Sequence, residues 1–366
     1  MRILVLLTDA YGGHGGIAAY NRDVLEALAG SGSTAVVALP RIASQPAGAV
    51  PEGVDFDLSA TGGGARYVRA LLKHLRRGRF DLVYCAHVNL SPLAWLAAKW
   101  AGCHWMLAIY GIEAWAPKSR RLVRMSSSRP DHVVSISDVT LQRFLAFSGV
   151  APAQTSLLPN AVHLEAFGIG QPDQEMARRL DVVGRKVILT FGRLASEERA
   201  KGFDEVIGIL PRLITQVPQL VYVIAGTGPD RGRLEARVSA LGLEEHVRFT
   251  GYVAEDEKAD LYRLADVFAL PSKGEGFGFV LLEAMACGVP VIASKVDGGR
   301  EAVRDGMLGR IVDPDNPDEL AKAILDALSE PQRIPPGLEY FAFPNFAARV
   351  RQLVASVAGS AQKLEV

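Results

Sequence analysis

The strongest constraint on the fold is a regular alternation of short apolar runs, rich in β-branched residues, with segments of helical pattern. This rhythm is typical of βα units that feed a parallel sheet. In the first half we expect strands at Arg2–Leu7, Thr34–Leu39, Asp81–Ala86, Trp105–Tyr110 and His132–Ile136. A second series begins at Lys186–Gly192 and continues with the runs LVYVIAG, VRFTGY, DVFALP and PVIAS. Because the rhythm starts anew, the sequence predicts two α/β domains.

The length of the chain agrees with two domains. Its 366 residues exceed the roughly 150 expected of one domain. The stretch from Asn160 to Pro172 is rich in Pro and Gly and suits a hinge. We therefore expect one Rossmann-like domain over residues 1–162 and another over 163–343, with an amphipathic helix at 344–358 that packs back on the first.

Three features favour a cytoplasmic protein. The apolar run in MRILVLLTD is too short for a signal sequence, and the apolar region Leu90–Ile112 is interrupted by Lys99 and Gly102, so it predicts no membrane span. The three cysteines lack CxxC spacing, which favours reduced, buried thiols.

The net charge of zero hides an asymmetry. Residues 1–162 hold 16 Lys or Arg and 10 Asp or Glu, whereas the remainder holds 24 and 30. Basic residues recur at helical spacing over 65–79, which predicts a basic amphipathic helix. Either this helix is a solvated surface helix packed on a sheet, or it binds an acidic acceptor or the anionic inner face of a membrane. No motif of nucleic-acid binding accompanies the charge, so no nucleic-acid partner is expected.

The densest functional signal is the segment GEGFGFVLLEAMACGVP, residues 274–290. Glu275 lies in a glycine-rich turn after an expected strand, and Glu283 follows on the next helix. A spacing of eight helical residues separates them by about 12 Å at most, on the order of the span of a nucleotide sugar. Backbone N–H groups at the helix start could hold a diphosphate between the two carboxylates without a metal. Alternatively, Glu275 caps the helix and Glu283 forms a surface salt bridge.

Two basic residues precede this segment. Arg193 follows a strand-ending Gly192, and Lys201 comes just before a helix. Basic groups at strand C-termini of an open α/β sheet face the crevice, where they can neutralise a leaving diphosphate. The simpler alternative is a pair of solvated side chains beside Glu197 and Glu198.

In combination, these motifs resemble a known family. The order GR, KGF, AGTGPDRGRLE, the Glu275 and Glu283 pair and EAMACGVPVIAS, preceded by GGHGGIAAYNRDVLEALA, AHVNLSPLA and GIEAW, is similar to the retaining glycosyltransferases of family 4. The resemblance spans nearly the whole chain. It implies the GT-B fold, with two Rossmann-like domains that face each other across a deep cleft.

The resemblance also implies roles for individual residues. Arg193 and Lys201 would contact the diphosphate, Glu275 the hydroxyls of the transferred sugar and Glu283 the ribose. Backbone around Phe277, Gly278 and Phe279 would hold sugar and phosphate, the turn Gly251, Tyr252 and Val253 would face the base, and Gly15 and Gly16 would lie in a loop that approaches the phosphates. That glycine loop, Gly12–Gly16, is otherwise a plain strand-to-helix turn.

The reaction implied is transfer of a sugar from a UDP- or GDP-linked donor to a hydroxyl of a glycan, a lipid-linked or a small-molecule acceptor. The family retains anomeric configuration, by a front-face displacement in which the leaving phosphate helps to deprotonate the acceptor. No covalent nucleophile, metal or cofactor is then needed. Charge stabilisation and positioning would be the contribution of the protein.

Two departures from the family pattern stand out. Tyr110 occupies the place of a histidine that contacts the donor sugar near its C6 hydroxyl, so it either reshapes that end of the pocket or reflects drift. PNAVH replaces the commoner PNGVD, which places Ala161 and His163 at the hinge.

Other candidate residues are weaker. His87, beside Asn89, is either a structural histidine or a sugar or acceptor contact. Asp55 with Asp57 and Asp313 with Asp315 form DxD patterns, but their contexts suit ordinary turns and caps more than a metal site.

Three other functions remain open at this point. Gly13, Gly15 and Ala18 satisfy G-x-G-x-x-A, a weak fingerprint of a nicotinamide-dependent oxidoreductase. Arg41 stands where such an enzyme would place an acidic residue for the ribose. A sugar-nucleotide epimerase or hydrolase of the same architecture, or a non-enzymatic binding module, would also fit.

Overall fold

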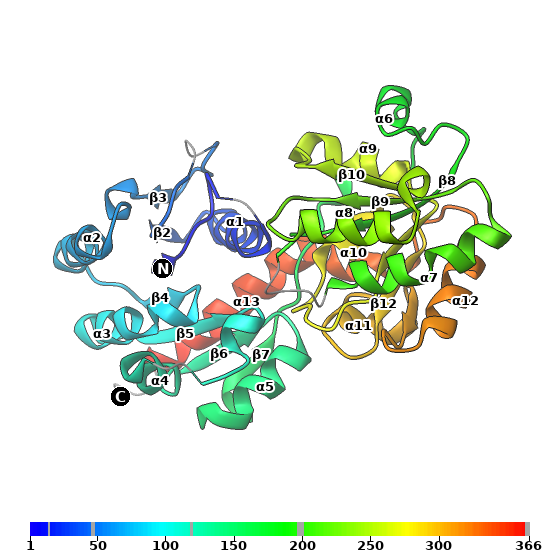
Figure 1. Cartoon of the computed structure of the whole chain (residues 1–366). Helices are drawn as coiled ribbons and strands as arrows, with labels where there is room; N and C mark the ends of the chain where they lie inside the picture. Colours follow the sequence, from blue (N-terminus) through cyan, green and yellow to red (C-terminus); the bar gives the residue numbers. More distant parts are fainter. Residues whose placement is uncertain (14, 45–47, 118–119, 196–200, 363–366) are drawn as a thin grey trace. The chain divides into compact units, whose positions relative to one another are not determined.

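The computed structural model describes residues 1–13, 15–44, 48–117, 120–195 and 201–362 (Figure 1). The chain forms two compact units, Met1–Ala161 with Phe343–Val366, and Val162–Ala342. It passes from the first to the second between Ala161 and Val162, within the Pro- and Gly-rich stretch. The predicted α/β class with two domains is confirmed.

The N-terminal unit is built on a parallel sheet of seven strands in the order β3-β2-β1-β4-β5-β6-β7. The strands are β1 Arg2–Leu7, β2 Ala35–Pro40, β3 Val54–Phe56, β4 Leu82–Cys85, β5 His104–Ile109, β6 His132–Ser135 and β7 Thr155–Leu157. β1, β4 and β5 are buried on both faces, which explains their nearly continuous apolar sequences.

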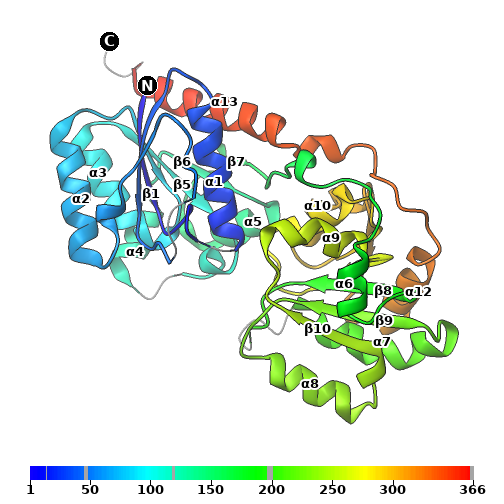
Figure 2. The same ribbon diagram turned by 90° about the horizontal axis from the view of Figure 1, so that it is seen from above.

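Helices cover both faces of this sheet (Figure 2). One face carries α2 Gly64–Arg77, α3 Ser91–Ala101, α4 Arg121–Ser127 and α5 Asp138–Ser148. The other carries α1 Gly16–Ala29 and α13 Phe343–Gln362. The ring of Tyr20 on α1 meets that of Phe346 on α13 edge-on at 5.5 Å, so the last helix belongs to the core of the N-terminal unit.

The C-terminal unit repeats the plan with a parallel sheet of six strands in the order β10-β9-β8-β11-β12-β13. The strands are β8 Lys186–Phe191, β9 Leu220–Ala225, β10 Val247–Gly251, β11 Val267–Leu270, β12 Val291–Ser294 and β13 Arg310–Val312. Helices α7 Phe203–Gln216, α8 Arg231–Ala240 and α12 Pro317–Ala327 form a core with one face. The remaining helices are α6 Gln174–Arg179, α9 Lys258–Arg263, α10 Phe279–Ala286 and α11 Gly299–Ala302.

Every strand expected from the sequence is present, within one or two residues of the expected ends. The sequence missed β3, β7 and β13, each of three residues at the edge of its sheet. The basic amphipathic helix expected at 65–79 is α2, which buries Tyr67, Leu71 and Leu75 against the sheet. In the described part of the chain, no helix is both long and apolar enough to cross a bilayer.

Candidate active site

The loop that carries Arg193 is fixed at the carboxyl end of β8 by close backbone contacts. Leu194 N donates to Thr227 O at 2.9 Å. A Cβ atom at Gly226 would lie 2.0 Å from Gly192 O, and one at Gly228 would lie 2.0 Å from Leu194 O. Only glycine therefore permits this packing, and it places the exposed Arg193 at the sheet edge where open α/β folds bind ligands.

A second close approach places Lys201. Gly202, the N-cap of α7, has φ +85, and a Cβ there would meet Pro271 at 2.8 Å. Lys201 thereby reaches the loop after β11, where its Nζ pairs with Glu275 Oε2 at 2.8 Å. The structure thus brings together two predicted residues 74 positions apart. Both side chains keep partial exposure, 16% and 18%.

The Glu275 loop leads directly into α10. Gly278 is the N-cap of α10, and its φ of +87 favours glycine. A Cβ at Gly278 would lie 3.2 Å from Glu275 Cγ, so the glutamate side chain lies beside the helix start. Phe279 is the first residue of α10, whereas the ring of Phe277 is buried against Phe341 at 5.7 Å. Because glycine offers no capping side chain, backbone N–H groups of the first helical turn are suited to an anion.

An aspartate that the sequence analysis missed supports this loop. Asp297 follows β12 and is fully buried. It accepts hydrogen bonds from the Ser272 hydroxyl at 2.7 Å and from Glu275 N at 2.8 Å. Burial raises the pKa of Asp297 to about 6, although its hydrogen bonds oppose the shift. The available signal was a lone acidic residue in SKVDGG just after an apolar strand.

Glu283 lies on α10 in a buried polar cluster. Its Oε2 accepts a hydrogen bond from the Tyr262 hydroxyl at 2.6 Å, and its Oε1 lies 3.4 Å from Lys258 Nζ. The residue is only 9% exposed, so the alternative of a surface salt bridge is wrong. Burial raises the pKa of Glu283, and the charge of Lys258 and the Tyr262 hydrogen bond offset part of the shift.

Lys258 and Tyr262 were also missed by the sequence analysis. They stand four residues apart on α9, a spacing that puts both on one helix face. Lys258 Nζ pairs with Glu255 at 2.9 Å and lies 5.6 Å from the ring centroids of Phe191 and Phe279. Burial lowers its pKa, but the two glutamates outweigh that effect and raise it overall. The lysine therefore stays charged beside Glu283.

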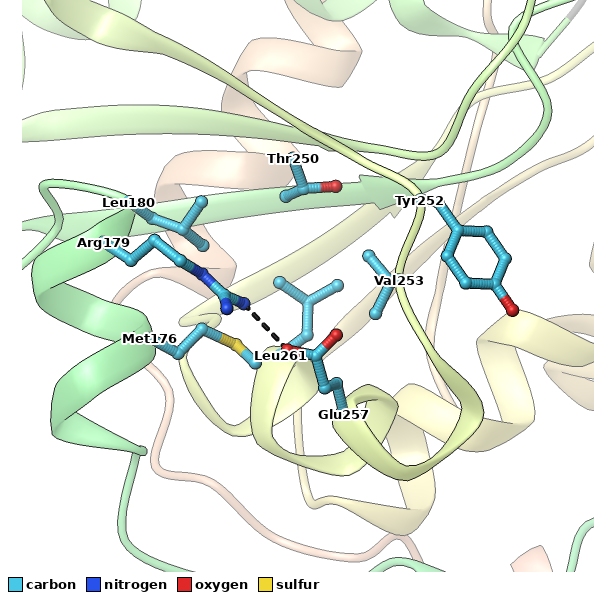
Figure 3. Close-up of a pocket in the computed structure, with 8 residues that line it drawn as sticks. All are labelled: Met176, Arg179, Leu180, Thr250, Tyr252, Val253, Glu257 and Leu261. Carbon is cyan, nitrogen blue, oxygen red and sulfur yellow. Dashed lines mark hydrogen bonds and ion pairs between the residues drawn. The ribbon is translucent and has the colours of Figure 1, made fainter.

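The turn predicted to face a base borders a pocket of about 260 Å³ (Figure 3). The pocket is lined by Met176, Arg179, Leu180, Thr250, Tyr252, Val253, Glu257 and Leu261. Arg179 and Glu257 form an ion pair of 3.0 Å across it. Val253 borders the hollow, whereas the ring of Tyr252 points away and is 63% exposed. Gly251, with φ +75, makes the turn.

In the N-terminal unit, the glycine loop after β1 leads into α1. Gly15, with φ +91, is the N-cap of α1, and Gly16 is its first residue. A Cβ at Gly13 would lie 2.6 Å from Asp9 Oδ2, so this loop too needs glycine for close packing. His14 lies outside the described residues. The predicted approach of this loop to a phosphate stays a prediction.

Tyr110 lies just after β5 and is buried, with 6% exposure. Its hydroxyl donates to Asn21 Oδ1 at 2.9 Å, and its ring is 5.2 Å from that of Tyr20. Tyr110 thus ties the end of β5 to α1, and its effect on a sugar pocket stays a prediction. His87 Nδ1 accepts from Asn89 N at 3.1 Å, a local cap that gives the pair a structural role.

Aspartates of both DxD patterns form local hydrogen bonds or ion pairs. Asp57 accepts from Ser59 N at 2.9 Å and pairs with Lys73 and His74 at 3.0 and 2.8 Å. Asp313 accepts from Asp315 N at 3.0 Å. Among the described residues, no group of three or more His, Cys, Asp or Glu is placed to hold a metal ion.

Comparison with known proteins identifies the family. Models of "Glycosyl transferases group 1" and "Glycosyl transferase 4-like domain" match residues 173–336 and 15–161. A GDP-mannose-dependent alpha-(1-6)-phosphatidylinositol monomannoside mannosyltransferase of Mycobacterium tuberculosis is 32% identical over 361 residues, 91% of this chain and 90% of the relative. The chain belongs to glycosyltransferase family 4.

A second relative agrees with this assignment, and a solved structure shows the fold. The D-inositol 3-phosphate glycosyltransferase of Geodermatophilus obscurus is 33% identical to this family 4 glycosyltransferase, with 78% of this chain and 68% of the relative covered. The crystal structure of Anabaena HepE with UDP and glucose superposes with a TM-score of 0.77, at 21% identity over 97% of this chain and 100% of that one. The predicted GT-B fold is thereby confirmed.

Proposed function

We propose that this glycosyltransferase moves a sugar from a nucleotide-diphosphate donor to a hydroxyl acceptor, with retention of configuration and without a metal. The observation that carries the proposal is the ion pair between Lys201 and Glu275, because it sets a cation beside a carboxylate at the carboxyl ends of β8 and β11. The cation suits the phosphates and the carboxylate suits the sugar hydroxyls.

In this proposal the diphosphate is held by charge. The acceptor oxygen forms a bond to the anomeric carbon while the bond to the β-phosphate oxygen breaks. Negative charge grows on that phosphate, and Arg193 and Lys201 neutralise it. The departing phosphate takes the acceptor proton on the same face, so the protein supplies neither base nor nucleophile.

Glu283 marks the other end of the donor. Its carboxylate is held by Tyr262 and Lys258, so it is fixed before any ligand arrives. A prearranged carboxylate suits the paired hydroxyls of a ribose, because little entropy is lost when they bind.

We propose GDP-mannose as the first donor to test. The relative with 91% coverage of this chain is named a GDP-mannose-dependent alpha-(1-6)-phosphatidylinositol monomannoside mannosyltransferase. UDP-sugars are tested as alternative donors. Phosphatidylinositol mannosides, inositol phosphates and water are compared as acceptors.

The test measures sugar transfer by mass spectrometry, in buffer with a chelator, and reads the anomeric configuration of the product by NMR. We expect acceptor-dependent transfer with retention. Glu275→Gln should lower kcat by about 100-fold if its contact strengthens in the transition state. The matched control Glu330→Gln, which only breaks an exposed pair with Arg310, should leave kcat unchanged. Donor loss without an acceptor would favour the hydrolase alternative, and chelator-sensitive transfer would refute metal independence.

We also propose that the N-terminal unit contacts an anionic membrane surface. Helices α2, α3 and α4 lie side by side (Figures 1 and 2). The exposed side of α2 is basic, with Arg66, Arg69, Arg76 and Arg77. Large apolar side chains are exposed on α3, at Leu96 and Trp100, and on α4, at Leu122. Basic charge attracts anionic headgroups, and apolar side chains can enter the interface.

Sedimentation with vesicles tests this contact. We expect binding to vesicles that contain phosphatidylglycerol, no binding to pure phosphatidylcholine, and release by salt. Arg69→Glu with Arg76→Glu should weaken binding at least about tenfold. The control Arg178→Glu with Lys322→Glu makes the same charge change on exposed residues of the C-terminal unit and should bind like the wild type. Equal binding to both vesicle types would refute the contact.

A further inference from the structure

The carboxylate of Asp297 joins two loops of the C-terminal unit. One loop, residues 272–278, follows β11 and carries Glu275; the other, residues 295–299, follows β12. Asp297 Oδ2 accepts from Ser272 and Glu275 N, and Oδ1 accepts from Gly299 N at 3.0 Å. Both oxygens are thus occupied, and one of their donors is the backbone of Glu275 itself.

A backbone contact reinforces the junction. Gly298 N donates to Glu275 O at 3.0 Å. A Cβ at Gly298 would lie 2.0 Å from Gly276 O, so the two loops touch backbone to backbone. The peptide N–H and C=O of Glu275 are therefore both held by the 297–298 segment, and the side chain of Glu275 starts from a fixed point.

Burial of the Asp297 carboxylate lowers the stability of the folded state. Asp297 is fully buried, and among the described residues that act on its carboxyl group none is basic. Its donors are a hydroxyl and two neutral amides, which solvate a carboxylate less well than water does. The nearby charge of Glu275 opposes ionisation further. Buried charge of this kind is concentrated at functional sites.

We infer that Asp297 is a positioning residue for transfer: it holds the Glu275 backbone so that the Glu275 carboxylate meets Lys201 and the transferred sugar. This inference rests on the proposed role of Glu275. Asp297 itself acts through Glu275 and touches neither donor nor acceptor.

Asp297→Asn tests the inference with little change of shape. The amide has one acceptor oxygen, so its NH₂ group must face either Glu275 N–H or Gly299 N–H, both of which are donors. In either orientation one of the two loops must shift, and because Gly298 N also donates to Glu275 O, a shift of either loop displaces the Glu275 backbone. We expect kcat to fall by about 10-fold to 100-fold, since small misplacement of a catalytic group has effects of this size. GDP affinity, measured by calorimetry, should stay within about twofold because Glu283 and Arg193 are not disturbed.

The calorimetric stoichiometry reports the folded, binding-competent fraction, so kcat is expressed per competent molecule. Asp266→Asn is the matched control. Asp266 also accepts a backbone N–H, from Val187 at 2.8 Å, but lies at the start of β11, at the opposite end of that strand. We expect its kcat to equal that of the wild type. If Asp297→Asn does not fold, Ser272→Ala removes one donor of Oδ2 and should lower kcat in the same direction by less.

A double-mutant cycle with Glu275→Ala decides whether Asp297 acts through Glu275. If it does, Glu275→Ala with Asp297→Asn should be no slower than Glu275→Ala alone, because the positioned group is already absent. Multiplicative losses, or an unchanged kcat in Asp297→Asn, would overturn the inference while leaving the proposed function intact. A wild-type kcat in Glu275→Ala would refute the proposed role of Glu275, whereas absence of sugar transfer in the wild type would refute the proposed function.

Discussion

At the scale of single residues, Glu283 is expected to contribute strongly to donor binding. Its carboxylate is buried and is bound by the Tyr262 hydroxyl and the Lys258 ammonium. Since a charge-assisted hydrogen bond contributes about 1.5 to 3 kcal/mol, Glu283→Ala should weaken donor binding by roughly 10-fold to 100-fold. Isothermal calorimetry with GDP-mannose measures this loss.

The control for this prediction is Tyr262→Phe, which removes only the hydroxyl. It leaves Glu283 in place and should weaken binding by less than about tenfold. Unchanged affinity in Glu283→Ala would show that the carboxylate does not contact the donor.

Tyr110 calls for two substitutions because its ring and its hydroxyl have separate environments. Tyr110→Phe leaves the buried Asn21 side chain without its donor and should cost about 1 to 3 kcal/mol of unfolding free energy. Urea denaturation measures this cost.

Tyr110→His tests the predicted effect on the C6 end of the sugar-binding pocket. The donor preference of this variant is compared with that of the wild type. The same preference in both would contradict the prediction.

Asp297 predicts a pH dependence of stability. Its pKa is raised from 3.8 to about 6, so between these pH values the folded state binds more protons than the unfolded state. Stability therefore falls as pH rises from 4 to 6, by on the order of 3 kcal/mol from this group, and the cost is fully present above pH 6.

Asp297→Asn removes this titration. As pH rises, the unfolding free energy of the wild type should therefore fall relative to that of Asp297→Asn. Urea denaturation of both proteins between pH 4.5 and 7.5 measures this change. A difference that does not change with pH would contradict the prediction.

Sequence patterns reached some of these residues and not others. Glu275 and Lys201 stand in glycine-rich motifs whose combination is specific, and the structure brings them together. Lys258, Tyr262 and Asp297 lie in segments without such a motif. Their importance comes from burial beside another charged residue, which depends on how distant strands pair and is not written in local spacing.

At the scale of elements, the sequence predicted the central strands but missed the edge strands. The central strands are buried on both faces and read as apolar runs, so the sequence located them. β3 and β7 are only partly buried and three residues long, and they join the first sheet at its two edges. Such strands need few apolar residues because they pack on one side only, which leaves little periodicity to detect.

The loop after β9 supports a prediction about packing between elements. Gly226→Ala would place a methyl group against Gly192 O and displace the segment that carries Arg193. We expect a loss of about 1 to 3 kcal/mol in stability and weaker donor binding, measured by thermal unfolding and calorimetry. Gly232→Ala, in α8 with open space around it, should instead be neutral or stabilising by up to about 1 kcal/mol. Equal behaviour of the two variants would show that the close approach is unimportant.

At the scale of the whole molecule, each unit has its own hydrophobic core. The four tryptophans of the chain, Trp95, Trp100, Trp105 and Trp115, all lie in the N-terminal unit. Tryptophan fluorescence therefore reports the unfolding of that unit, whereas circular dichroism reports both. Residues proposed to bind the diphosphate and ribose, Arg193, Lys201 and Glu283, all belong to the C-terminal unit.

These facts predict how a ligand shifts thermal unfolding. A ligand that binds only the folded state adds RT ln(1 + [L]/Kd), about 2.7 kcal/mol at 100 times Kd, to the unit that it contacts. GDP should therefore raise the midpoint seen by circular dichroism more than the midpoint seen by tryptophan fluorescence, and Glu283→Ala should reduce the larger shift. A shift confined to the fluorescence transition would place the nucleotide on the N-terminal unit, and the assignment of Arg193, Lys201 and Glu283 to the donor would then be wrong.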